Sequence, residues 1–247
     1  MARVLVGASG WSYATWIPRF YPMGTKSAVL LASYATRLGS TEVNYTFNHL
    51  PSEKTVTAWL AATPDDFIFA LKASQRITHF DRLAHPADTL PPFFERARLL
   101  GARLGPVFFQ TPPWLKRDDD LLAGFVASLP PDVRCALEVR HESWYVEPVY
   151  ELLRLRGVAL VHAEGEKTPS PIETVGTTAP FVYVRLRSDE GYDDASVARW
   201  ATRLRTEQTA GRDVYAYFKH DEDGSNGLAA IKLHTALTTD ADSPLST

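Results

Sequence analysis

Charged side chains recur at the ends of the short apolar runs of this sequence. Glu42 and Glu138 could each act as a general base that takes a proton from a substrate or from water. Basic side chains occupy similar positions, and lysine and arginine suit the binding of phosphate or carboxylate groups. These basic residues are Lys72, Arg140, Arg185, Arg187 and Lys219. The combination indicates chemistry on an anionic substrate, with Lys72, Arg140 and Arg185 stabilising the charge that develops in the transition state.

Other polar and aromatic residues accompany these charged groups. Tyr217 could donate a proton or orient the substrate, and further hydrogen bonds to the substrate could come from Asn44, Gln110 and His141. Trp11 and Trp144 could flank the ligand, because aromatic side chains stack on bases and sugar rings. Alternatively, the aromatic residues near these positions pack on one another as a lid.

Eight short apolar runs are the elements that must position these residues. They are rich in β-branched and aromatic residues and bounded by Gly, Pro or Asp, which predicts strands. The runs are Val4–Val6, Glu42–Tyr45, Phe67–Leu71, Val107–Phe109, Cys135–Val139, Val158–Val161, Phe181–Leu186 and Val214–Phe218. Helical segments separate them, so the strands are expected to be parallel. We expect an α/β fold, a single (β/α)8 TIM-like barrel, with an open doubly wound sheet as the alternative.

The connections give this barrel a direction. Helix-to-strand turns are short, whereas the strand-to-helix loops at 8–25, 73–91 and 165–180 are long. Barrels of this kind carry their chemistry in the loops at the C-terminal ends of the strands. We expect one barrel domain over residues 1–237 and a flexible tail over 238–247.

Side chains alternate along a strand, which predicts the residues that point into the barrel. The inward positions near the strand ends are Glu42, Asn44, Lys72, Gln110, Glu138, Arg140, His162, Glu164, Arg185, Arg187, Tyr217 and Lys219. Basic groups outnumber acidic ones among them, although the chain carries a formal net charge of -3. A concave cationic mouth attracts anions. The structural alternative is a network of salt bridges that satisfies itself and caps the core.

The sequence predicts no particular cofactor, because it contains no GxxxxGK[ST], HExxH or CxxC motif. A divalent metal stays open as an alternative, held by a set drawn from His162, Glu164, Glu138, His141 and Glu42. The lone cysteine, Cys135, cannot form an internal disulfide, and no segment approaches the ~20 apolar residues of a membrane helix. We therefore expect a cytoplasmic protein that does not bind membranes, and its oligomeric state stays open.

Several stretches of the chain resemble the YecE-like barrels, the domain-of-unknown-function family number seventy-two. They include GASGWSY at 7–13, EVN at 42–44, FALKA at 69–73 with Thr78-His79, LGPV at 104–107, EVRH at 138–141 and YVRL at 183–186. The resemblance covers nearly the whole chain and implies a TIM-like barrel. It implies no particular reaction, because the family has no settled activity.

The chain departs from the family pattern at Glu164, where an Asp is common, at Asn48-His49, where Tyr and Arg are common, and at two strand ends where the charge changes. Arg187-Ser188 stands where the family usually has His-Gly, and Lys219-His220 stands where it has Asn-Asn. Both departures add positive charge. The family's site is therefore altered here, toward a more cationic mouth.

These observations favour an enzyme that acts on a phosphate-bearing or other anionic substrate, nucleic acid included, by a hydrolase or lyase reaction. One alternative is a non-catalytic module that binds nucleic acid or a phosphorylated ligand, with salt-sensitive binding and no turnover. A second alternative is a metal-dependent hydrolase or isomerase.

Overall fold

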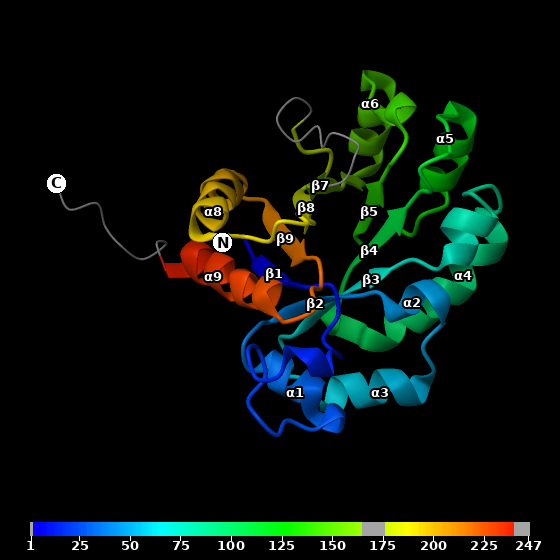
Figure 1. The fold of residues 1–247 in the computed structure, drawn as a ribbon. Coiled ribbons are helices and arrows are strands. Elements are labelled where there is room, and N and C mark those ends of the chain that lie inside the picture. Colours follow the sequence, from blue (N-terminus) through cyan, green and yellow to red (C-terminus); the bar gives the residue numbers. More distant parts are fainter. Residues whose placement is uncertain (1, 165–175, 240–247) are drawn as a thin grey trace.

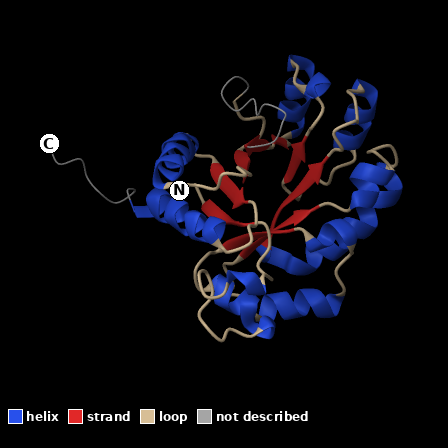
Figure 2. Cartoon of the chain, viewed as in Figure 1, coloured by secondary structure: helices blue, strands red, loops and turns tan. Residues whose placement is uncertain are grey.

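The computed structural model describes residues 2–164 and 176–239, in which the strands lie at the centre and helices surround them (Figures 1 and 2). Every strand pair is parallel. The order in one sheet is β2 (Ser40–Val43), β3 (Ile68–Lys72), β4 (Leu104–Gln110), β5 (Cys135–Glu138) and β6 (Ala159–Leu160). The order in the other is β1 (Val4–Ala8), β9 (Asp213–Phe218), β8 (Phe181–Leu186) and β7 (His162–Glu164).

The two sheets meet at two places. On one side, a single parallel bridge joins Ser9, directly after β1, to Glu42 in β2. On the other side, only Val161 separates β6 from β7, and its N–H donates to the carbonyl of Leu137 at 2.9 Å. The prediction of an α/β fold with parallel strands is thus confirmed. Within the described residues the strands form two sheets rather than one continuous hydrogen-bonded ring.

The helices follow the strands as the periodicity predicts. They are α1 (Leu30–Ala35), α2 (Tyr45–Asn48), α3 (Glu53–Ala61), α4 (Pro86–Ala97), α5 (Asp119–Ala127), α6 (Glu147–Arg156), α8 (Asp194–Thr209) and α9 (Ser225–Thr239). Helix α6 has Pro148 in its first turn, where no backbone donor is needed, and ends at Gly157 in the left-handed conformation (φ 62°). No helix in the described ranges is long and apolar enough to cross a membrane.

Two apolar clusters divide the interior. In β3, Phe69 and Leu71 belong to a large outer cluster shared with the helices, whereas Ile68 and Ala70 belong to a smaller inner cluster enclosed by the strands. This alternation is the one that the sequence predicts. Gly7 allows β1 to approach β2, since a Cβ there would lie 2.0 Å from the carbonyl oxygen of Ser40.

The prediction for the sixth strand is wrong about which face of the sheet its side chains occupy. His162 and Glu164 are predicted to point inward, but their partners in register on β8 are Val184 and Leu186, which belong to the outer cluster. Val161 is the residue that joins the inner cluster. A shift of one residue moves every side chain of a strand to its other face, so the error affects both residues together.

Two predicted boundaries also change. The loop expected to run to Pro91 gives way at Pro86 to helix α4, which contains Pro91 and Pro92 on its exposed face. The tail expected from residue 238 starts inside α9, which continues to Thr239. The rest of that tail, and residues 165–175 of the last predicted loop, lie outside the described residues.

Candidate active site

A buried arginine joins two carboxylates at the C-terminal ends of the strands. Arg185 of β8 is fully buried, and its Nε and Nη2 donate to Glu42 Oε2 and Oε1 at 2.9 and 3.0 Å. Its Nη1 donates to Glu138 Oε2 at 2.6 Å, and the guanidinium carbon lies 4.4 Å from the centre of the Phe108 ring. We call Glu42, Glu138 and Arg185 the arginine–carboxylate core. All three of its predicted members therefore come together.

Both oxygens of each carboxylate accept hydrogen bonds. Glu42 also accepts from the hydroxyls of Ser9 and Tyr183, each at 2.9 Å, and Glu138 accepts from Gln110 Nε2 at 2.6 Å. Burial by itself raises the pKa of Glu42, but the charge and hydrogen bonds of Arg185 outweigh it and lower that pKa to about 2. The same opposition lowers the pKa of Glu138. Both groups are charged at neutral pH and are weak bases there.

Lys72, the last residue of β3, is a cation of a different kind. It is partly buried, and its Nζ donates to Gln110 Oε1 at 2.8 Å and lies 4.2 Å from the centre of the Phe47 ring. No carboxylate forms an ion pair with it in the part of the chain that the structure describes. Burial, followed by the charge of Arg185, lowers the pKa of Lys72 to about 8, against the opposing charges of both core carboxylates.

Two further arginines stand near this lysine, and both are partly buried. Arg187, just after β8, helps to lower the pKa of Glu42 and that of Lys72 through its positive charge. Arg140, just after β5, helps to lower the pKa of His79 through its positive charge. We call Lys72, Arg140 and Arg187 the outer cations. With Arg185, these are four of the five basic residues that the sequence predicts for this end of the strands.

His79 is the group that the sequence did not single out for chemistry. It lies in a π-helical turn, Arg76–Phe80, that follows β3, and its ring is 5.0 Å from the Phe47 ring and 6.3 Å from the Trp114 ring. Burial, then the charges of Lys72 and Arg140, lowers the pKa of His79. Turns of this type occur often at functional sites. Two features of the sequence could have indicated His79 as a functional residue: the length of the loop after the third strand and the Thr78-His79 pair.

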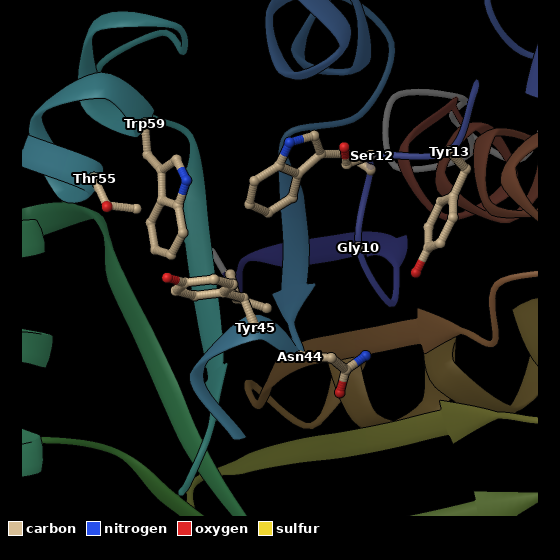
Figure 3. Close-up of a pocket in the computed structure, with 9 residues that line it drawn as sticks. Gly10, Ser12, Tyr13, Asn44, Tyr45, Thr55 and Trp59 are labelled. Carbon is tan, nitrogen blue, oxygen red and sulfur yellow. The ribbon is translucent and has the colours of Figure 1, made fainter. Parts of the chain in front are cut away.

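An aromatic pocket opens beside the core. It has a volume of about 410 Å³, and its lining includes Trp11, Tyr13, Asn44, Tyr45 and Trp59. In Figure 3, Asn44 lies between the rings of Tyr45 and Tyr13, and Trp59 faces the same opening. Tyr13 connects the pocket to the core, because its hydroxyl donates to the carbonyl of Ser9 at 2.8 Å. Trp11 and Asn44, which the sequence suggests as ligand-contacting residues, both line this pocket.

Two predicted ligand-facing residues are instead interior. Trp144 is fully buried in the outer cluster, and its indole N–H donates to the carbonyl of Leu115 at 2.7 Å, so it does not flank a ligand. Tyr217 is fully buried in the inner cluster, where its hydroxyl pairs with Ser40 Oγ at 2.7 Å. Burial raises the pKa of Tyr217 far above the usual range for tyrosine. A proton on this hydroxyl is therefore not available for transfer near neutral pH.

His141 and Lys219 serve local structure. His141 Nδ1 lies 2.9 Å from Ser143 Oγ and accepts from the Ser143 N–H at 3.1 Å, which caps the 3₁₀ turn Glu142–Trp144. Lys219 lies at the surface, where its Nζ pairs with Asp189 at 2.6 Å. Within residues 2–164 and 176–239, no three His, Cys, Asp or Glu side chains converge in a way that could hold a metal ion. The metal-binding set considered from the sequence is therefore not assembled there.

Comparison with known proteins identifies the family. A family model described as "Protein of unknown function DUF72" matches residues 5–247. The chain belongs to this family. The UPF0759 protein YunF of Bacillus subtilis (strain 168) is 24% identical over 93% of this chain and 94% of its own length. The UPF0759 protein YecE of Escherichia coli (strain K12) is 30% identical over 63% of this chain and 55% of its own length.

Solved DUF72 structures have the same fold. A DUF72 family protein from Thermotoga maritima MSB8 matches with a TM-score of 0.72 at 24% identity, over 95% of this chain and 99% of that one. Another from Enterococcus faecalis V583 matches with a TM-score of 0.75 at 17% identity, over 96% and 98%.

The two strand-end departures from the DUF72 pattern have different consequences for the site. The charge of Arg187 reaches Glu42 and Lys72, whereas Lys219 is neutralised by Asp189 at the surface. Only the first adds charge to the mouth.

Proposed function

We propose that this chain is an enzyme that acts on a small anionic substrate, a phosphate ester or a carboxylate, at a mouth bordered by the outer cations. The observation that carries the proposal is Lys72, a partly buried ammonium at a strand end with no carboxylate paired to it among the described residues. Burying a charge without a counter-ion is costly, and an anionic ligand would offset that cost. A merely structural cation would be paired, as Arg185 is.

A closed barrel would give this mouth its shape. We infer that the two sheets act as one (β/α)8 barrel, with β6 and β7 as the two halves of a single strand. The Ser9–Glu42 bridge and the short Val161 connection support this arrangement. So does the inner cluster, which takes side chains from β1, β3, β4, β5, β6, β8 and β9. The residues at the strand ends would then face one shared opening.

The proposed roles follow from pKa and burial. Glu42 and Glu138 are candidates for the general base, but their lowered pKa and their hydrogen bonds to Arg185 suit them better to holding this arginine. Lys72 is partly buried, and a pKa of about 8 lets it exchange a proton near neutral pH. The lowered pKa of His79 favours its neutral imidazole, which can accept a proton. We therefore assign proton transfer to these two groups and charge stabilisation to Arg140 and Arg187.

The aromatic pocket would receive the uncharged part of the substrate. Trp11 and Trp59 pack edge to face at 5.6 Å, and Tyr45 is 47% exposed at the opening. Aromatic walls with a few polar groups, here including Asn44, are typical of sites for small organic ligands. A substrate with both an anionic group and an apolar or ring portion fits this pair of subsites.

A second candidate is a module that binds single-stranded nucleic acid without turnover. It is favoured by two large aromatic side chains, Phe80 and Trp114, which are 68% and 62% exposed on the segments that carry or contact His79. Exposed rings next to positive charge can stack on successive bases. Oligothymidylate would then bind with a strong salt dependence that inorganic phosphate does not reproduce.

Calorimetric titration with inorganic phosphate tests the anion site. We expect binding by the wild-type chain, about tenfold or more weaker binding by Lys72→Met, and weaker binding at high salt. Lys232→Met is the matched control, because Lys232 pairs with Asp194 on the exposed surface at 2.5 Å. Equal phosphate affinity in wild type and Lys72→Met would refute the assignment of the site. Turnover is measured separately, with p-nitrophenyl phosphate as the probe.

A further inference from the structure

We propose that Lys72 is a nucleophile that forms an imine with an aldehyde or ketone, so that the substrate is a carbonyl compound bearing an anionic group. This inference deepens the proposed function and rests on it for the anionic half of the substrate. It assigns a covalent role to an amine that anion binding alone treats as a fixed charge.

The position of Lys72 is fixed at both ends of the residue. Its backbone carbonyl accepts from Thr46 Oγ1 at 2.6 Å, and the next N–H, of Ala73, donates to the Phe108 carbonyl at 2.8 Å. Its Nζ is held by Gln110 Oε1 at 2.8 Å. An amine that is tethered in this way loses little freedom when a carbonyl carbon approaches it.

Gln110 holds the amine without neutralising it. Its Nε2 donates to Glu138 Oε1, which fixes the amide so that Oε1 faces Lys72. An amide oxygen accepts one hydrogen from nitrogen in either protonation state, whereas a carboxylate would favour the ammonium and raise its pKa. Lys219 and Lys232 show that contrast, because both donate to aspartates at 2.6 and 2.5 Å.

The surroundings of Lys72 favour the neutral amine, which is the nucleophilic form. Burial and the charges of Arg185 and Arg187 lower its pKa to about 8, and the carboxylates of Glu42 and Glu138 oppose them. About a quarter of the side chains would then be neutral at pH 7.5, compared with roughly one in a thousand for an ordinary lysine.

The imine step balances with the groups at hand. The amine nitrogen attacks the carbonyl carbon, the C=O π bond opens, and a proton passes from nitrogen to the new oxygen. The carbinolamine hydroxyl then takes up a second proton and leaves as water while the nitrogen lone pair forms the C=N bond, and the protonated imine returns that proton when it loses its N–H hydrogen. His79 is a suitable proton carrier for both stages, since its ring lies 5.0 Å from the same Phe47 ring that is 4.2 Å from Lys72 Nζ. No oxidant, reductant or metal is required.

Two residues with positive φ hold the segment that carries His79. Arg82 and Leu83 have φ values of 48° and 68°, directly after the π-helical turn. Such conformations are uncommon for residues other than glycine, and they cluster at functional sites. Leu83 is buried in the outer cluster, which anchors the turn over the mouth side of β3. The strain is consistent with a segment whose position matters.

Borohydride trapping with pyridoxal 5′-phosphate, an aldehyde that carries a phosphate, tests the inference. The full chain is incubated with this probe at pH 7.5, reduced, digested and mapped by mass spectrometry. We expect Lys72 to be labelled at least about tenfold faster than any other lysine, with a rate that rises through a midpoint near pH 8. Lys232→Met should label as wild type does. Labelling spread evenly over surface lysines would overturn the inference.

Lys72→Arg separates this inference from the function beneath it. Arginine keeps the positive charge but cannot form the imine, so the variant should still bind inorganic phosphate and should not be trapped. If wild type binds phosphate but Lys72 is never trapped, the imine is refuted and the anion site stands. If Lys72 is trapped but phosphate neither binds nor protects it, the anion site is refuted and the reactive amine stands.

Discussion

Arg185 and Lys72 both lie at the C-terminal ends of their strands, yet their surroundings differ in kind. Arg185 makes three hydrogen bonds to two carboxylates and is fully buried. Lys72 donates to one neutral amide and stays partly exposed. Gln110 contacts both groups, because its amide donates to Glu138 of the arginine–carboxylate core and accepts from Lys72. Arg185 is therefore a cation that stabilises the fold, whereas we propose that Lys72 is a cation that binds a ligand.

The largest effect on stability is expected for the substitution Arg185→Met. Removing the guanidinium leaves Glu42 and Glu138 buried without a cation, which should lower the free energy of unfolding by about 3–5 kcal/mol at pH 7. Burial would then raise the pKa of both carboxyls above their unfolded values, so the variant should regain stability as pH falls. The wild type behaves oppositely, because the pKa of Glu42 is lowered from 4.5 to about 2 and its contribution is lost on acidification.

Urea unfolding at pH 5 and pH 8 measures this prediction. A variant with Glu42→Gln, Glu138→Gln and Arg185→Met removes all three charges and should recover part of the loss. A cost below about 1 kcal/mol for Arg185→Met would contradict a structural role for the core.

Lys72→Met should raise the free energy of unfolding, whereas Arg185→Met lowers it. Its pKa falls from 10.5 to about 8 on folding, so the folded chain releases a proton in that window and wild-type stability rises with pH through it. The shift corresponds to ~3 kcal/mol before allowance for partial exposure, and the lost Gln110 hydrogen bond offsets ~1 kcal/mol. We expect a net stabilisation of about 1 to 2 kcal/mol at pH 7, measured by urea unfolding. A destabilised variant with unchanged pH dependence would count against an uncompensated charge.

The smallest effect is expected at Lys219. Lys219→Met removes an exposed ion pair with Asp189, so its stability should change by less than about 1 kcal/mol. Phosphate affinity and trapping at Lys72 should match those of wild type. A loss of phosphate binding in this variant would extend the mouth beyond the outer cations.

The sequence predicted the core well because strand alternation is a local property. It brought Glu42, Glu138 and Arg185 together correctly, along with Gln110 and Lys72. It erred at His162 and Glu164 because the alternation was assigned one residue out of phase: Ala159 and Val161 join the inner cluster, so His162 and Glu164 lie on the outer face. Alternation separates the two faces of a strand, but it does not by itself say which face is the inner one.

Other features depended on tertiary contacts that no local pattern contains. Trp144 and Trp11 both follow strands in aromatic loops, yet only Trp11 lines a cavity, whereas Trp144 fills the outer core. His79 became visible only when a π-helical turn placed it near Lys72. The sequence could predict which charged residues lie at this end of the strands, but it could not predict how each charge is paired.

The pKa of Lys72 in the folded chain tests the central contrast most directly. NMR titration of lysine labelled with ¹³C at the ε position, assigned with Lys72→Arg, follows this group alone. We expect a midpoint near pH 8 for Lys72, well below the ordinary lysine value of about 10.4. A Lys72 midpoint at or above that ordinary value would mean that the amine is paired like the others, and would contradict the account.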